Sequence, residues 1–322
     1  MTPQSIKTNE EIVSRLLQGD QRAAARMISL IEDDDSSVAS LMAQIFQHTG
    51  KATVVGVTGP PGAGKSTLVQ RMAHVWRESD RTVGVLAIDP SSSFTGGAIL
   101  GDRIRMSSLD SDRGVFIRSM ASRSHLGGIA EATPAAIRVL DAMGMDIVIV
   151  ETVGVGQSEI AIADAADCTV FVTMPGTGDA VQTMKAGVME IGNVFVVNKA
   201  DHDGALNTQR ELRSMLHLQE QTPAPPVLLT RADIGVGVDD LVETIDEYVR
   251  VISSTGVIEE HRFQHLKHET LDLIGRQARR QSTFALAQES LFELTTALRE
   301  RKLDPVSVAA LVVAKIWGPN HE

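Results

Sequence analysis

The chain has 322 residues, of which 43% are hydrophobic and 22% are charged, the composition of a globular protein larger than one typical domain. Its net charge of −11 opposes non-specific binding to phosphate backbones, which excludes nucleic acid as a main partner. Met1–Asn9 lacks the apolar core of a secretory signal, and no apolar run is long enough to cross a membrane, so we expect a cytoplasmic protein.

The first 50 residues predict an N-terminal helical segment, because apolar and charged positions recur there at helical spacing. One helix is expected from about Ser36 to His48, with Gly50 as its stop signal.

Residues 51–253 predict a three-layer α/β domain. Short β-branched runs alternate there with amphipathic helical stretches, which indicates a mostly parallel sheet covered by helices. The only cysteine, Cys168, lies in one of these apolar runs and is expected to be a buried structural thiol. The expected strands are Val54–Val57, Val83–Ile88, Ile147–Val150, Val170–Val172, Val194–Val197 and Pro226–Leu229.

Residues 254–322 return to a helical pattern, with breaks expected at Gln281–Thr283 and at Asp304–Pro305. Apolar residues recur on helix faces that need a partner. They are Leu291, Leu294, Leu298, Val308, Leu311, Val312 and Ile316.

Gly59–Ser66 reads G-P-P-G-A-G-K-S directly after an expected strand and before an expected helix, which predicts a phosphate-binding loop. The glycines allow the backbone to curl around phosphate oxygens, and the following helix adds its positive N-terminal end. Lys65 is expected to reach the β- and γ-phosphates, and Ser66 to bind Mg²⁺.

Asn198, Lys199 and Asp201 spell N-K-x-D at the end of another expected strand. The Asp201 carboxylate can accept hydrogen bonds from N1–H and the 2-amino group of guanine, whereas adenine offers an acceptor at N1. The motif therefore favours GTP over ATP.

Glu151–Gly154 ends the expected strand that begins near Ile147 and resembles a γ-phosphate sensor. Glu151 stands where many GTPases have aspartate. It can contact Mg²⁺ through a water molecule, or it can contact the attacking water. The competing interpretation is that a glutamate at the end of a strand merely caps the next helix. Gly154 is expected to meet the γ-phosphate. Gln157 is a candidate for positioning the attacking water.

Asp89–Met106 has no regular helical or strand pattern. Asp89 ends a strand and Asp102 follows a glycine-rich stretch, so both are candidate Mg²⁺ ligands, since Mg²⁺ prefers oxygen. The competing interpretation is that both aspartates are merely solvated.

With these elements in this order, the chain resembles the methylmalonyl-CoA mutase-associated GTPases, the MeaB/ArgK family. The resemblance rests on Val55–Ser66, Asp89–Met106, Glu151–Glu159 and Asn198–Asp201, and on Pro175–Ile191, which looks like the family's additional switch loop. It extends over nearly the full chain.

The resemblance implies a P-loop NTPase fold and a G-protein chaperone that uses GTP/GDP and Mg²⁺. Such a protein gates adenosylcobalamin loading and protection of an acyl-CoA mutase of the methylmalonyl-CoA mutase type. It also implies a homodimer joined through the C-terminal helical arm, residues 254–322.

Motifs and resemblance together assign candidate roles to individual residues. The catalytic candidates are Lys65, Glu151 and Gln157. The metal candidates are Ser66, Asp89, Asp102 and Glu151. The resemblance places Gln182 and Lys185 in the additional switch. The nucleotide-binding candidates are Gly59, Gly62, Ala63, Gly64, Lys65, Ser66, Thr67, Gly154, Asn198, Lys199, Asp201 and Ala232.

Thr230–Ala232 reads T-R-A, where the family more often has T-S-A beside the base. The N–H of Ala232 is expected to serve guanine O6, and Arg231 to alter nucleotide affinity or exchange.

Three alternatives remain open. A metal-insertion (nickel) GTPase needs a Cys- or His-rich site, and His261, His265 and His268, which have helical spacing, are more typical of a solvated helix face. A transport ATPase or kinase is opposed by Asp201 and by the absence of a membrane span. A nucleotide-locked scaffold with negligible turnover is opposed by the set of candidate switches.

Overall fold

A parallel β-sheet organises residues 1–259, the first of two compact units; the second comprises residues 260–322. The structure is a computed structural model that describes residues 9–89, 112–121, 132–152, 164–176, 190–218, 224–286 and 291–317. The sheet order is β3-β2-β4-β1-β5-β6-β7, and all neighbouring strands are parallel. The strands are β1 (Thr53–Thr58), β2 (Val83–Asp89), β3 (Val115–Ala121), β4 (Ile147–Thr152), β5 (Cys168–Thr173), β6 (Val194–Val197) and β7 (Val227–Leu229).

The predicted α/β class with a parallel sheet is confirmed, and each of the six expected strands overlaps an observed one. Central strands are covered on both faces, which explains their near-continuous runs of valine and isoleucine. All residues of β4 and β5 are buried. Cys168 at the start of β5 is fully buried as expected, and this burial raises the pKa of its thiol.

Strand β3 was missed by the sequence analysis. It lies at the edge of the sheet and carries Arg118 and Ser119 among its apolar residues. Gln21 donates from its side-chain amide to the carbonyls of Arg113 and Val115 at the start of this strand. An edge strand has a neighbouring strand on only one side, and polar groups such as the Gln21 side chain can bind its other side. Its sequence can therefore carry more polar residues than a central strand.

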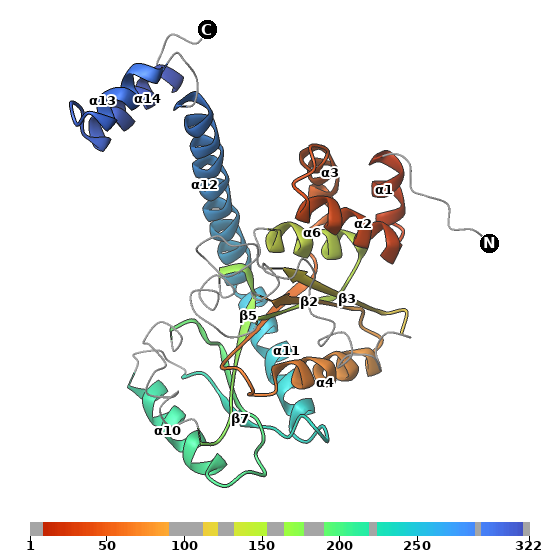
Figure 1. Ribbon diagram of the computed structural model, residues 1–322. Coiled ribbons are helices and arrows are strands. Elements are labelled where there is room, and N and C mark those ends of the chain that lie inside the picture. Colours follow the sequence, from red (N-terminus) through yellow and green to blue (C-terminus); the bar gives the residue numbers. More distant parts are fainter. Residues whose placement is uncertain are drawn as a thin grey trace. The chain divides into compact units, whose positions relative to one another are not determined.

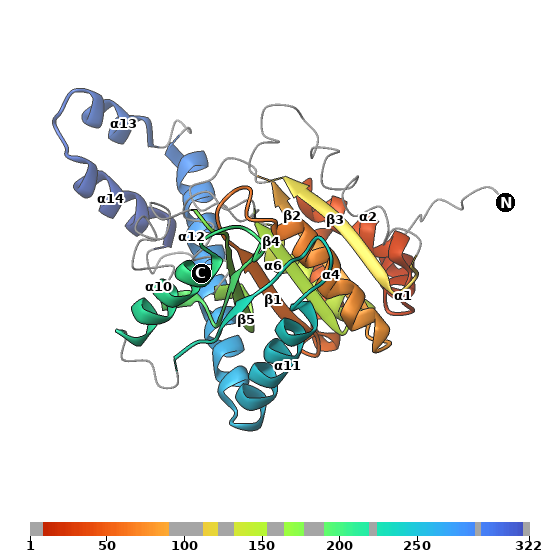
Figure 2. The ribbon, with the colours of Figure 1, turned by 90° about the horizontal axis from the view of Figure 1, so that it is seen from below.

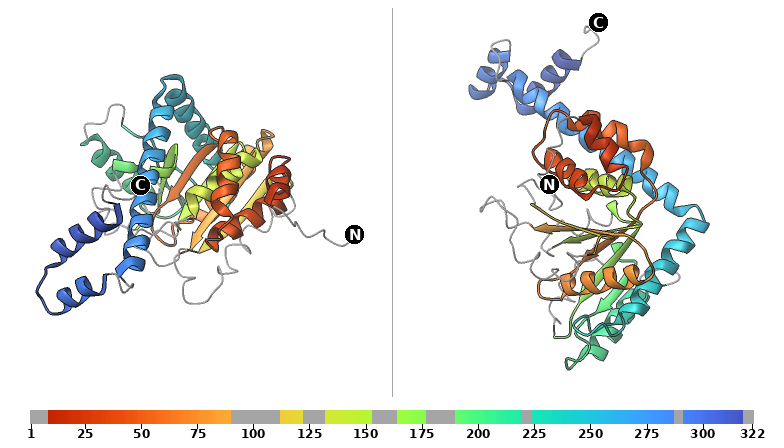
Figure 3. Two further views of the ribbon diagram at one scale, coloured as in Figure 1. Left: turned by 90° about the horizontal axis from the view of Figure 1, so that it is seen from above. Right: turned by 90° about the vertical axis from the view of Figure 1, so that its right-hand side faces the viewer.

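Helices cover both faces of the sheet in the first unit (Figure 1; Figure 3, right). Successive residues of a strand point to opposite faces, so Val54 joins one core and Val55 the other. On the first face lie α1 (Asn9–Leu16), α2 (Gln21–Glu32), α3 (Val38–Ile45) with the short turn η1 (Phe46–His48), and α6 (Thr133–Met143). On the opposite face lie α4 (Lys65–Glu78) and α11 (Val238–Ser254), which are seen in front of the strands in Figure 2.

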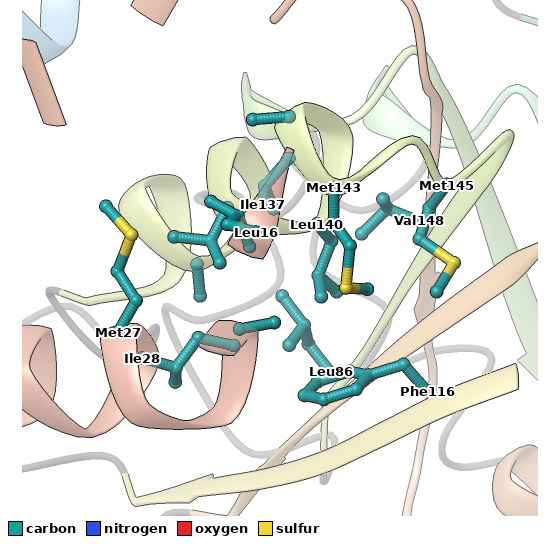
Figure 4. Packing of buried hydrophobic residues seen from close by; sticks show 14 of the residues in the cluster. Leu16, Met27, Ile28, Leu86, Phe116, Ile137, Leu140, Met143, Met145 and Val148 are labelled. Atoms are coloured by element: carbon teal, nitrogen blue, oxygen red, sulfur yellow. The ribbon is translucent and has the colours of Figure 1, made fainter. Parts of the chain in front are cut away.

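The N-terminal helices share a core with the sheet. Figure 4 shows Met27 and Ile28 of α2 and Leu140 of α6 packed over Leu86 and Phe116 of the strands. The helix expected near Ser36–His48 appears as α3 and η1. The domain boundary expected near residue 50 stays a prediction, although the helices before it lie within the first compact unit.

A smaller core on the first face holds α10 (Ala205–His217). Its residues Leu212 and Leu216 pack with Phe171 of β5 and Phe195 of β6. The two phenylalanine rings lie with their centroids 5.9 Å apart. This core supports the end of the sheet from which the N-K-x-D motif leaves β6.

The C-terminal residues form α12 (Val257–Leu286), α13 (Phe292–Arg299) and α14 (Pro305–Trp317). The break expected at Gln281–Thr283 is wrong, because α12 continues through these residues, whose weak helix propensity is overridden. The break before Pro305 is confirmed, and the Asp304 carboxylate accepts from the N–H groups of Val306 and Ser307.

Part of the predicted apolar surface of these helices is covered by the helices themselves. Leu291, Val308 and Val312 are buried, with Leu294 and Ile316 packed against them. In contrast, six large apolar side chains of α12 are more than half exposed: Val257, Phe263, Leu271, Leu273, Ile274 and Phe284. Among the described helices, none is long and apolar enough to cross a lipid bilayer.

Candidate functional site

The predicted phosphate-binding loop connects the end of β1 at Thr58 to the start of α4 at Lys65. Gly59, Gly62 and Gly64 have φ angles of 141°, 78° and 89°, a backbone region that favours glycine. A Cβ atom on Gly59 would lie 1.9 Å from the carbonyl oxygen of Val172, and one on Gly64 would lie 2.4 Å from Asn198 Nδ2. The loop therefore requires glycine at both ends for conformation and for space.

Lys65 lies within this loop. Its Nζ donates to the carbonyls of Gly59, at 2.7 Å, and Pro60, at 3.0 Å, and the residue is only 6% exposed. Its positive charge is thus held against the loop at the N-terminal end of α4, where backbone N–H groups also favour an anion.

Ser66, near the start of α4, contacts Glu151, near the end of β4. The pairing of β1 with β4 aligns Val57 with Glu151, and Ser66 lies one helical position into α4. Ser66 Oγ donates to Glu151 Oε1 at 2.6 Å, and Glu151 is 7% exposed. A hydroxyl and a carboxylate oxygen in contact are a donor set that suits Mg²⁺.

Asp89 is the last residue of β2, the other strand that pairs with β4. Its backbone therefore belongs to the same carboxyl edge of the sheet as Glu151, while its side chain is outside the described residues. The other predicted positions that lie outside the described residues are Asp102, Gly154, Gln157, Gln182 and Lys185.

Asn198 connects the two predicted nucleotide motifs. Its Nδ2 donates to the carbonyl of Ala63 in the phosphate loop at 2.8 Å, and its Oδ1 accepts from Thr230 Oγ1 at 3.0 Å and from the Ala232 N–H at 3.1 Å. Because Asn198 is 2% exposed, these bonds are shielded from water. Its amide thus ties the phosphate loop to the loop that follows β7.

The Ala232 amide, expected to serve guanine O6, instead donates to Asn198 in the structure. The loop around it is also held by α4, because Arg71 donates from Nε to the carbonyl of Ala232 and from Nη2 to that of Asp233. Sequence reasoning missed Arg71 and the hydrogen bond of Thr230 to Asn198, since the partners are distant in the chain.

The remaining members of N-K-x-D lie toward the surface. Lys199 has a φ of 55°, and its Nζ lies 3.6 Å from Met174 Sδ beyond β5. Asp201 has a side chain that is 41% exposed, and its Oδ1 lies 3.3 Å from Arg231 Nε. Of the other predicted contacts, Thr67 is exposed on α4, whereas Ala63, within the phosphate loop, is fully buried.

The structure therefore brings a phosphate-type loop, a hydroxyl–carboxylate pair and an aspartate-bearing loop to one edge of a parallel sheet, where such folds bind ligands. Within the described ranges, no group of three or more His, Cys, Asp or Glu side chains could hold a metal ion, and this includes His261, His265 and His268 of α12.

Comparison with known proteins agrees with this geometry. Residues 24–285 match the family model described as methylmalonyl Co-A mutase-associated GTPase MeaB. A Pyrococcus horikoshii protein named "Putative GTPase" is 45% identical over 314 residues, covering 96% of this chain and 98% of that protein. GTPase ArgK of Escherichia coli is 35% identical, covering 80% of this chain and 81% of its own.

A solved structure described as an LAO/AO transport system kinase has the same fold, with a TM-score of 0.70 and 25% sequence identity. The match covers 98% of this chain and 99% of that chain. Family model, relatives and fold agree: the chain belongs to the methylmalonyl-CoA mutase-associated GTPase family, and it is a GTPase.

Proposed function

We propose that this GTPase is a Mg²⁺-dependent switch that gates adenosylcobalamin loading and protection of an acyl-CoA mutase of the methylmalonyl-CoA mutase type. Two names support the choice of client. The family description names that mutase, and a mouse relative, 33% identical over 273 residues, is named the methylmalonic aciduria type A homolog. We expect the protein to act in the cytoplasm.

The single observation that supports a switch best is the side chain of Asn198. It joins the phosphate loop, through Ala63, to the loop of Thr230 and Ala232. A buried network of this kind makes occupation of the phosphate end and of the base end interdependent. Asn198 still has a second amide hydrogen that can serve the base.

Guanine would be selected by Asp201, which stands on the loop after β6. Its two carboxylate oxygens can accept from N1–H and the 2-amino group together, and adenine cannot supply both donors. The Asp201 side chain is 41% exposed, which places its carboxylate at the surface of this loop.

The phosphate end would hold the triphosphate and its metal. Mg²⁺, when bound, neutralises charge on the phosphates, and the residues that would hold it here are Ser66 and Glu151, which are already in contact. Lys65 would leave the carbonyls of Gly59 and Pro60 to offset the charge that develops on the transferred group.

Hydrolysis would be slow until a client completes the site. The water-positioning role of Gln157, the γ-phosphate contact of Gly154, the metal-binding roles of Asp89 and Asp102, and the switch roles of Gln182 and Lys185 stay predictions.

The proposal includes a homodimer joined through the C-terminal helices. Exposed Leu271, Ile274 and Phe284 support it, because α12 carries more uncovered apolar surface than a solvated helix needs. The small core around Leu291 and Val308 covers only part of the apolar side chains of this segment.

The test is steady-state hydrolysis of GTP and of ATP by the purified chain, alone and with an adenosylcobalamin-dependent methylmalonyl-CoA mutase. We expect hydrolysis of GTP over ATP and a rate that rises at least about tenfold with the mutase, since completing a phosphoryl-transfer site has large effects. Bovine serum albumin at equal concentration is the control for crowding. A GTP rate indifferent to acyl-CoA mutases would contradict the chaperone role, and equal use of ATP would contradict guanine selection.

A further inference from the structure

Arg231 holds the carboxylate proposed to read guanine. Its Nε lies 3.3 Å from Asp201 Oδ1, and its Nη2 lies 3.3 Å from Asp233 Oδ2. The guanidinium therefore bridges Asp201 of the loop after β6 and Asp233 of the loop after β7, here called the base loop (residues 230–237), and the Arg231 side chain is 35% exposed.

The backbone below this side chain is fixed. Arg231 donates its N–H to the carbonyl of Val236 and accepts at its own carbonyl from Ile234 and Gly235. Arg71 holds the next two carbonyls from α4. The Arg231 side chain can therefore change its partner while the backbone of the loop stays in place.

Arginine presents to Asp201 the same chemistry as guanine. The N1–C2–N2 edge of guanine is itself a planar guanidine-like fragment that donates two N–H groups, and a carboxylate accepts both donors side by side. The Arg231 guanidinium carries N–H groups of the same kind, and its Nε lies in ion-pair contact with Oδ1, one of the two oxygens that guanine needs.

We propose that Arg231 is an intramolecular competitor of guanine: its guanidinium occupies Asp201 in the nucleotide-free protein and must leave before the base docks. This inference rests on the proposed guanine-reading role of Asp201. Asp233 makes the exchange easy, because Arg231 keeps an ionic partner when it releases Asp201.

The expected size of the competition follows from exposure. Pairs between exposed charges shift an equilibrium by about fivefold at most. If Arg231 holds Asp201 in most molecules, the observed dissociation constant for nucleotide is raised by the inverse of the fraction in which Asp201 is open. As a consequence, the nucleotide binds more slowly and less tightly than it would if Asp201 were open in every molecule.

The experiment measures binding of GDP with a fluorescent ribose label to the full chain by stopped flow. Arg231→Ala should raise the association rate about two- to fivefold and lower the dissociation constant by the same factor, with the dissociation rate unchanged. Arg250→Ala on α11, whose partner is Glu247, removes one equal charge elsewhere. This control should slow association slightly, because losing a positive charge weakens attraction to phosphates.

The same Arg231→Ala substitution made in the Asp201→Asn variant tests whether its effect depends on the Asp201 carboxylate. In Asp201→Asn, tested with the corresponding xanthine diphosphate, Arg231→Ala should change association by less than about 1.5-fold, because the neutral amide no longer holds the guanidinium. Weaker or unchanged GDP binding in Arg231→Ala would overturn the inference, since Arg231 would then support the bound base or take no part. If Asp201→Asn does not exchange guanine for xanthine, the base-reading assignment itself is wrong and the inference falls with it.

Discussion

The two ends of the proposed nucleotide site are built differently. At the phosphate end, Lys65 and Glu151 are almost fully buried and are held by short hydrogen bonds. At the base end, Asn198, Thr230 and Ala232 are buried, while the side chains of Asp201 and Arg231 are between a third and a half exposed. A buried polar group that loses its hydrogen-bond partner costs considerable free energy, whereas an exposed ion pair can exchange partners at a small cost in free energy. The phosphate end is thus suited to chemistry and the base end to selection and exchange.

The largest effect is expected from Lys65→Ala at the buried phosphate end. Removing a charged donor from the transferred phosphate should lower kcat/KM for GTP about a thousandfold, measured as phosphate release. The matched control is Lys302→Ala, a lysine paired with Glu300 in the second compact unit, which should retain the wild-type rate. A melting temperature equal to that of the wild type would show that the loss is not one of folding. Near-normal turnover would refute the assigned role of the loop.

A smaller effect is expected from Asp201→Asn at the exposed base end. Losing charge-assisted hydrogen bonds to the base should weaken GTP binding roughly 10- to 100-fold, while xanthine triphosphate gains, because its 2-oxygen accepts from the new amide. Competition binding against both nucleotides measures the exchange. The contacts at the phosphate end should not change, so tripolyphosphate should compete equally well for the wild type and for Asp201→Asn. If the preference for guanine over xanthine does not change, the base binds elsewhere.

An effect on stability, comparable in free energy with that of Asp201→Asn on binding, is expected from Asn198→Ala, which removes the connection between the two ends. Burying the Ala63 carbonyl and the Ala232 N–H without their partner should lower the free energy of unfolding by about 1–3 kcal/mol. Denaturant titration measures this loss. Asn198→Asp serves as a comparison, because it keeps the acceptor for Thr230 and Ala232 but replaces the donor to Ala63 with a buried carboxylate oxygen that faces the Ala63 carbonyl. If both variants are as stable as the wild type, the two ends are not coupled through this side chain.

The central fold was predictable because local pattern and tertiary role coincide there. Strands such as β4 and β5 are buried on both faces, so their sequences are apolar throughout. β3 was not predictable by the same rule, since its polar residues belong to an edge of the sheet. The continuation of α12 through Gln281–Thr283 was also missed, because weak local propensity did not end the helix.

Local spacing was enough to identify the phosphate loop, the N-K-x-D motif and the parallel class, since glycine conformations and strand-end positions depend on neighbours in the chain. Strand order alone set the contacts of Ser66 with Glu151, of Asn198 with Ala63 and of Arg71 with the base loop. The pairing of Arg231 with Asp201 likewise joins residues that are apart in sequence. Such contacts were beyond reach from the sequence, because they depend on the strand order β4-β1-β5-β6-β7 in the folded sheet.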